Sequence, residues 1–154
     1  MYRVIYEETD FIVLSKYAGF LSIKARGSLS NEISVFDDLK KRYNKIYIVH
    51  RLDKDTSGIM LFAKNKSSHK ILCGLFESKS IDKRYLALVF GDIKSDSFKV
   101  EKSIKEFGSG RMGVSSDGKN AVTEFSVVKR FDKYTLIEAK PITGKRHQIR
   151  VHLY

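Results

Sequence analysis

An α+β fold, with a mixed and mainly antiparallel β-sheet and a few flanking helices, is predicted by two patterns in the 154-residue sequence. Short apolar runs rich in β-branched and aromatic residues recur along the chain, and each ends at polar residues or glycine. Two other segments have the apolar spacing of a helix. Because 42% of the residues are hydrophobic, the chain can bury one core of ordinary size. We therefore expect a single domain over residues 1–154, without an internal boundary.

The apolar runs are predicted to be strands. They cover residues 11–14, 46–49, 59–63, 85–90, 98–107, 121–131 and 134–139. Asp132 and Lys133 lie between the last two runs, in which apolar and polar residues alternate. This pattern predicts a hairpin turn at these two residues.

Residues 33–43 are predicted to form a helix, because an apolar stripe there is backed by charged residues. A second helix is expected to follow a cap at Ser67 or Ser68. Residues 143–153 are compatible with a short helix or a strand, and the pattern does not decide between them.

The charge balance favours a polyanionic partner. The chain has 29 Lys and Arg residues against 18 Asp and Glu, which gives a formal net charge of +11. Such an excess is most often used to bind nucleic acid, although a basic surface kept for solubility is the alternative. The charge alone does not separate an RNA enzyme from a passive RNA-binding domain.

Cysteine content and hydropathy limit where the protein can act. The single cysteine, Cys73, excludes an intramolecular disulfide and a structural metal site with several thiolates. No apolar run approaches the roughly 18–20 residues of a membrane span, and the charged start lacks a signal-peptide core. We expect a soluble cytoplasmic protein that does not bind a membrane.

Residues 108–113 (GSGRMG) match the G-x-G-x-x-G pattern of dinucleotide-binding sites. That pattern requires a helix to begin at its end, so that backbone N–H groups face the pyrophosphate. Here polar residues lead instead into the predicted strand 121–131. We therefore expect a flexible basic loop between strands and no nucleotide site.

Residues 50–58 (HRLDKDTSG) form the densest polar segment beside predicted strands. Arg51 and Asp53 are expected on one side of an extended backbone, with Leu52 turned into the core. A turn stabilised by the side chains of residues 55–57 is the alternative, but it leaves Asp53 without a role.

Two more segments carry candidate functional groups. In residues 143–153 (TGKRHQIRVHL), a strand would present Arg150 and His152 on one face and bury the apolar residues between them. Residues 83–85 (KRY) lie at the start of the predicted strand 85–90, which follows the second helix. A tyrosine at a strand end, such as Tyr85, more often belongs to the core than to a catalytic site.

These three segments resemble the three motifs of the RluA-type RNA pseudouridine synthases, in the same order and at similar spacing. Weaker similarities at residues 16–19 and 118–123 extend the resemblance over essentially the whole chain. It implies a pseudouridine synthase catalytic domain that isomerises a specific uridine in structured rRNA or tRNA. It also implies that no cofactor or metal is needed and that DNA is not a partner.

The resemblance assigns roles to individual residues. Asp53 matches the catalytic aspartate, Tyr85 the active-site tyrosine, and Arg150 the basic residue that pairs with the aspartate. Arg51 matches the arginine that helps to hold the flipped-out nucleotide. Further candidates for RNA binding are His147, Arg111, Lys145, Arg146, Lys40, Lys41, Arg42 and Lys45.

The chemistry of these side chains fits the implied reaction. Cleavage of an N-glycosidic bond leaves positive character on the sugar, so an ionised carboxylate at C1′ or C2′ is required. Whether Asp53 adds to C1′ or removes the C2′ proton stays open. Arg150 would favour the charged carboxylate, and Tyr85 offers a ring face for uracil and a phenolic oxygen for proton transfer from C5.

Two alternatives and three departures accompany this hypothesis. A hydrolase of N-glycosides or phosphodiesters would need a second carboxylate, and Asp55 is the one nearby candidate. A passive RNA-binding domain would make Asp53 dispensable.

Tyr17 stands where the family has proline, and Lys145 stands where it has arginine. The sequence also stops at Tyr154, so we expect that C-terminal elements of the family are missing and that no separate N-terminal RNA-binding domain is present.

Overall fold

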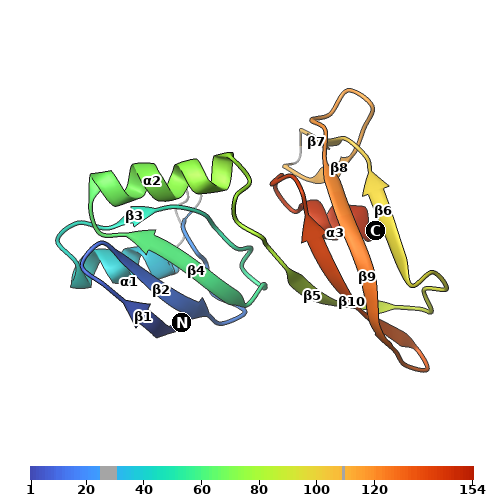
Figure 1. Ribbon diagram of the computed structural model, residues 1–154, viewed down its shortest axis with the longest axis horizontal. Helices are drawn as coiled ribbons and strands as arrows, with labels where there is room; N and C mark the ends of the chain where they lie inside the picture. The colour runs from blue at the N-terminus through green and yellow to red at the C-terminus, as the bar shows by residue number, and fades with distance from the viewer. Residues whose placement is uncertain (25–30, 109) are drawn as a thin grey trace. The chain divides into compact units, whose positions relative to one another are not determined.

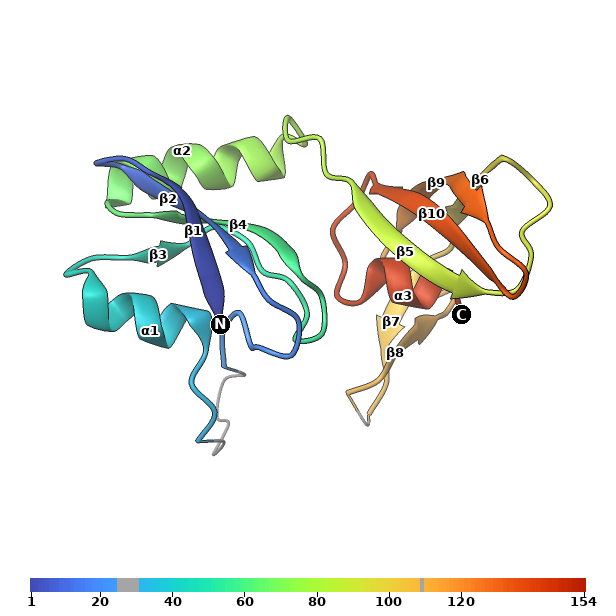
Figure 2. The same cartoon turned by 90° about the horizontal axis from the view of Figure 1, so that it is seen from below.

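The computed structural model describes residues 1–24, 31–108 and 110–154. These residues form two compact units, Met1–Ser80 and Ile81–Tyr154, each with its own antiparallel sheet (Figures 1 and 2). The predicted α+β class, mainly antiparallel with a few helices, is confirmed. That both units together make one catalytic domain stays a prediction.

The first unit combines an antiparallel sheet with helices α1 (Val35–Arg42) and α2 (Lys66–Glu77). In sheet order, its strands are β1 (Tyr2–Glu7), β2 (Phe11–Lys16), β4 (Gly58–Ala63) and β3 (Tyr47–Ile48). Alternate residues of the central strands are buried, and Phe36 of α1 stacks on Phe62 of β4 with ring centroids 6.4 Å apart. The core of this unit therefore lies between its sheet and α1.

The helix starts in the first unit are set by side-chain caps. Ser34 and Asp37 form a capping box at the start of α1. At α2 the cap is Asn65, whose side-chain oxygen accepts a hydrogen bond from the Ser68 N–H at 2.8 Å. The predicted cap at Ser67 or Ser68 is therefore wrong, because Asn65 takes the N-cap position two or three residues earlier and binds a free N–H of the first turn.

The second unit contains a larger sheet, a hairpin and the short helix α3 (Gln148–His152). In sheet order, its strands are β5 (Tyr85–Phe90), β10 (Tyr134–Pro141), β9 (Val122–Arg130) and β6 (Ser97–Glu101). Phe125, Ile137 and Ala139 form the centre of its core. Helix α3 covers this face of the sheet, as Figure 2 shows, and packs its apolar residues against the same cluster.

The predicted strand 98–107 is divided into β6 and β7 (Ile104–Glu106) in the structure. Strand β7 pairs with β8 (Met112–Val114), a short strand that the sequence analysis missed. Strand β8 begins where a dinucleotide site would need a helix, so the expected loop between strands is confirmed. Residue 109 of this loop lies outside the described residues. The hairpin turn at residues 132–133 is also confirmed.

None of the helices formed by the described residues has the length and hydropathy of a membrane span.

Candidate active site

The loop that carries Asp53 connects β3 to β4 in the first unit. Arg51 is exposed, Leu52 is buried, and Asp53 is half-buried. This order is the one expected from an extended backbone that turns Leu52 into the core. The backbone N–H of Thr56 donates to the carbonyl of Asp53 at 3.2 Å, which closes the turn that follows.

Buried polar groups fix the backbone immediately before Asp53. The hydroxyl of Ser22 donates to the Leu52 carbonyl at 2.7 Å and accepts from the Leu52 N–H at 3.1 Å. Two residues before Leu52, Nε2 of His50 accepts from the Leu61 N–H at 3.1 Å, and the His50 ring stacks on Phe76. The loop is thus attached to a strand and a helix, so Asp53 projects from a rigid support.

Lys16 fixes the backbone immediately after Asp53. Its side chain is fully buried, and its Nζ donates to the carbonyls of Tyr17 (3.0 Å), Phe20 (2.8 Å) and Lys54 (2.9 Å). These three bonds use all three donors of the ammonium group. Burial lowers the pKa of Lys16, and the nearby carboxylates of Asp55 and Asp53 oppose that shift.

The sequence analysis did not assign Lys16 to the site. A signal was present, because Lys16 continues the alternation of Ile12 and Leu14 and so falls on the buried face of β2. A lysine at a core position requires hydrogen-bond partners for its charge. Here those partners are the carbonyls of the loops around Asp53.

The segment of residues 143–153 contains a helix in the structure. Residues Gln148–His152 form α3, so the strand alternative, with Arg150 and His152 on one face, is wrong. Residues two apart on a helix point in nearly opposite directions. Arg150 is accordingly exposed, whereas His152 is half-buried and bonds to Thr123 Oγ1 (2.9 Å, from Nδ1) and to the Lys102 carbonyl (3.0 Å, from Nε2).

Gln148 attaches α3 to the neighbouring strand. Its side chain is buried, and Nε2 donates to the Val122 carbonyl (2.9 Å) and to Thr123 Oγ1 (3.0 Å). Its Oε1 accepts from Thr143 Oγ1 (2.7 Å) and from the Lys145 N–H (2.9 Å). The amide therefore uses both donors and both acceptor positions, and it holds the segment before α3 against β9.

Replacing Gln148 with leucine is expected to lower the free energy of unfolding by about 2–4 kcal/mol. The change leaves the half-buried Thr143 hydroxyl and Lys145 N–H without their amide partner, whereas the Val122 carbonyl keeps the Ile142 N–H at 3.0 Å. Each of the two losses costs roughly 1–2 kcal/mol. Urea unfolding followed by circular dichroism measures the effect. The control is R146Q, which removes only the exposed ion pair between Arg146 and Glu106. Equal unfolding midpoints for the two variants would show that the Gln148 bonds do not stabilise the fold.

Tyr85 begins β5 in the second unit and is half-buried. It packs against the cluster of Phe125, Ile137 and Ala139, on the face of the sheet that also receives Ile149 of α3. The ring therefore takes part in the core at a strand end. Tyr85 and the helix that carries Arg150 share one face of this sheet.

The remaining basic candidates differ in exposure. Those of the first unit, Lys40, Lys41, Arg42 and Lys45, are all exposed. Arg111 is exposed between β7 and β8, and Arg146 is exposed and paired with Glu106 at 2.7 Å. Lys145 and His147 are half-buried, and His147 has a left-handed backbone with φ of 55°. Nδ1 of His147 lies 3.3 Å from Nη1 of Arg150. The basic residues of the segment 143–153 thus lie close together around the start of α3.

Asp53, Arg51 and the basic candidates of residues 40–45 belong to the first unit, and the other predicted site residues belong to the second. The pairing of Asp53 with Arg150 would join residues of different units, and it stays a prediction. Within the described residues, no group of three His, Cys, Asp or Glu side chains is placed to hold a metal ion.

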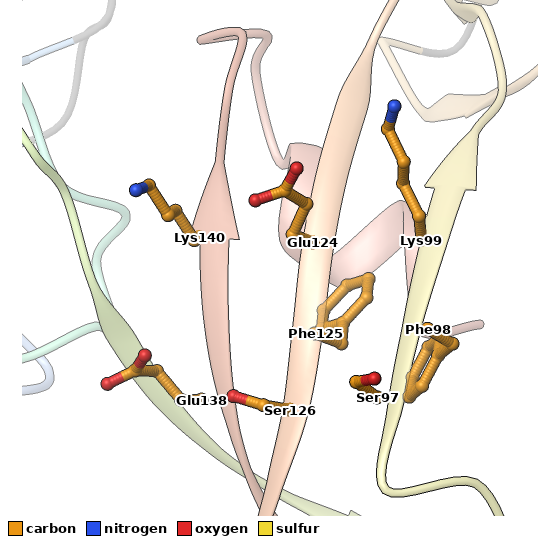
Figure 3. A pocket seen from close by; sticks show the side chains of 8 residues that line it. All are labelled: Ser97, Phe98, Lys99, Glu124, Phe125, Ser126, Glu138 and Lys140. Carbon is orange, nitrogen blue, oxygen red and sulfur yellow. The ribbon is translucent and has the colours of Figure 1, made fainter.

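A hollow of about 440 Å³ lies over the sheet of the second unit, and none of the predicted site residues lines it (Figure 3). It is lined by Ser97, Phe98, Lys99, Glu124, Phe125, Ser126, Glu138 and Lys140. Glu124 lies opposite Lys99 on one neighbouring strand and opposite Lys140 on the other. These opposite charges balance across the strands, so the hollow does not have the character of an anion site.

Comparison with known proteins shows the family. The family model described as RNA pseudouridylate synthase matches residues 10–154. The chain therefore belongs to the RNA pseudouridylate synthase family, as its motifs predict.

Several curated relatives are similar along almost the whole chain. The uncharacterized RNA pseudouridine synthase YlyB of Bacillus subtilis (strain 168) is 37% identical over 97% of this chain and 52% of its own length. Ribosomal large subunit pseudouridine synthase C of Vibrio parahaemolyticus is 37% identical over 98% of this chain and 48% of its own length. The chain thus spans about half the length of the curated relatives it matches.

A solved structure has a similar fold. Human RNA Pseudouridylate Synthase Domain Containing 1 superimposes with a TM-score of 0.81 at 25% identity, and the match covers 99% of this chain and 64% of the human one. The pseudouridine synthase fold predicted from the motifs is confirmed by this likeness.

Proposed function

We propose that this protein isomerises a specific uridine to pseudouridine in structured RNA. The observation that carries the proposal is the position of Asp53: a half-exposed carboxylate on a loop whose backbone is fixed on one side by Ser22 and on the other by Lys16. The loop lies inside the segment matched by the family model. A carboxylate held in this way is preorganised to act on a nucleotide brought to it.

In the proposed reaction, Asp53 acts on the ribose of an extruded uridine. The carboxylate either adds to C1′ or removes the C2′ proton, and the N1–C1′ bond breaks. The uracil then turns and C5 bonds to C1′, which displaces the carboxylate from C1′ on the first route; on the second route the carboxyl group returns its proton to C2′. The C5 proton leaves and N1 gains a proton, so the product is an isomer of the substrate. Arg150 pairs with Asp53 and favours its charged form, while the Tyr85 ring stacks on the uracil.

Binding and extrusion of the nucleotide draw on the basic surface. Removing a nucleotide from an RNA helix costs a few kcal/mol, and contacts to the phosphates offset this cost. Arg51 holds the extruded state, and Arg111, Lys145, Arg146 and His147 contact the backbone. The formal net charge of +11 supports a polyanionic substrate.

Ribosomal RNA is the substrate we propose, with transfer RNA as the other outcome of the test. The support comes from the relatives named ribosomal large subunit pseudouridine synthase C and D, which are 37% and 38% identical to this chain. A ribosomal target would place the protein in the cytoplasm, as the sequence predicts.

Mapping of pseudouridines in total RNA tests this proposal directly. Cells with the full-length gene are compared with cells that lack it and with cells in which it is restored. We expect one or a few pseudouridines to disappear from large-subunit ribosomal RNA and to return on restoration. If every site persists without the gene, the synthase proposal fails, and losses confined to transfer RNA would correct the substrate.

A further inference from the structure

Two aromatic side chains are exposed on the loop that follows β2. Tyr17 is 49% exposed and Phe20 is 39% exposed, although both belong to residue types that usually bury most of their surface. The roles proposed above for the reaction use neither ring.

The backbone of this loop is held by its own hydrogen bonds. The Tyr17 N–H donates to the Met1 carbonyl at 2.9 Å, and the carbonyls of Tyr17 and Phe20 both accept from Lys16 Nζ. Gly19, with φ of 84°, makes the turn between them and would strain any other residue. Because these bonds use backbone atoms, the position of the loop does not depend on the two rings.

The same loop is hydrogen-bonded to the residue beside Asp53. The Lys54 carbonyl accepts from the Gly19 N–H at 3.0 Å and from Lys16 Nζ at 2.9 Å. The two rings are thus carried by a rigid loop that is joined directly to the loop of the proposed catalytic carboxylate. All of these residues lie in the first unit.

We propose that Tyr17 and Phe20 form a stacking platform for unpaired RNA bases next to the target uridine. The inference rests on the proposed function, because extrusion of a uridine leaves its neighbours partly unstacked. An aromatic ring restores that stacking for any base, and each stacked base contributes roughly 5- to 100-fold in affinity.

Two features favour RNA over a protein as the occupant. The chain carries a formal net charge of +11, and the platform is continuous with the loop of Asp53. A stable protein interface needs about 1,000 Å² or more of buried surface, which two half-exposed rings do not supply.

A tryptophan reporter tests the platform, because the chain contains no tryptophan. Y17W places an indole on the platform, and Y6W is the matched control, since Tyr6 is 50% exposed on β1 of the same unit. Both full-length variants are titrated with a fluorescently labelled RNA hairpin that has an unpaired uridine-containing loop. We expect the emission of Y17W to be quenched as the hairpin binds and that of Y6W to change little.

The anisotropy of the labelled hairpin, recorded in the same titration, separates the two ways of failing. If the hairpin binds and the Y17W emission does not change, or changes as in Y6W, the platform is refuted while RNA binding stands. If the hairpin binds to neither the variants nor the wild type, the proposed function itself is contradicted.

Truncation of the rings gives an independent measurement. The double variant Y17A/F20A is expected to bind the hairpin at least about tenfold more weakly, with an unchanged urea midpoint because the loop is held by backbone bonds. Y17F, which keeps the ring, should bind like the wild type, and Y6A is the control for loss of an exposed tyrosine. Weakening by Y17F as large as that by Y17A/F20A would assign the effect to the hydroxyl and overturn the stacking role.

Discussion

Replacement of Asp53 by asparagine is expected to reduce pseudouridine formation by at least about 10³-fold, while the fold and RNA binding are kept. Asparagine has nearly the same shape as aspartate but carries no negative charge, so it can neither stabilise the cationic sugar nor act as nucleophile or base. The loop does not depend on this carboxylate for its backbone, since Ser22 and Lys16 bind the carbonyls of Leu52 and Lys54. Single-turnover conversion of a uridine in a transcript of the mapped RNA measures the effect.

The matched control is D55N, which neutralises an exposed carboxylate in the same loop. Its rate is expected to stay close to that of the wild type. Equal rates for D53N and the wild type would exclude Asp53 as the catalytic group. Absence of turnover in the wild type, with RNA binding retained, would instead favour the passive RNA-binding domain.

The second large effect is expected at Lys16. K16M should lower the free energy of unfolding by about 2–4 kcal/mol, because the carbonyls of Tyr17 and Phe20 lose the buried ammonium group to which they are bonded in a partly buried position. Part of the loss is offset, since methionine has no charge to desolvate. Urea unfolding measures the total change, and amide hydrogen exchange of the loops around Leu52 and Gly19 locates it.

The matched control for K16M is K54M, which removes an exposed lysine paired with Glu32 at 2.7 Å. Such surface pairs contribute about 0–1 kcal/mol. A destabilisation by K16M no greater than that of K54M would show that the buried ammonium does not support the loop.

The pKa of Lys16 gives this comparison a pH dependence. Because burial lowers the pKa of Lys16 in the folded state, the unfolded chain retains this proton to higher pH than the folded chain does. The contribution of Lys16 to stability therefore rises with pH between the lowered value and the ordinary value of about 10.4. The wild-type curve should show this rise on the alkaline side, and the K16M curve should lack it.

The elements that could be predicted from sequence are those whose residues follow a regular local pattern. Strand β5 begins and ends as predicted because its alternation places Ala87 and Val89 inward and Leu88 outward. The inward position of Leu52 followed from the same periodicity. Strand β1 was missed because nearly all of its residues are exposed, and a strand without a buried face leaves no alternation to read.

The features that could not be predicted depend on residues far apart in the chain. The bond from Lys16 to the Lys54 carbonyl spans 38 positions, and the bond from Gln148 to the Val122 carbonyl spans 26. Helix α3 is stabilised because Ile149 and Leu153 contact the sheet. These two residues have the i, i+4 spacing of a helix, but the segment is too short for that period to be distinguished from the alternation of a strand. Such tertiary contacts outweigh local propensity.

The hydrogen bonds around Gln148 extend to the imidazole ring of His152. The Lys102 carbonyl can only accept, so Nε2 of His152 carries a proton. In the neutral imidazole Nδ1 then accepts the hydroxyl hydrogen of Thr123, whose oxygen accepts from the Gln148 amide. The hydrogens of this series then all point the same way, from the Gln148 amide of α3 through Thr123 of β9 and His152 to the Lys102 carbonyl that precedes β7. T123V, which replaces this buried hydroxyl with a methyl group, would remove both the acceptor of the Gln148 amide and the partner of His152 in one change.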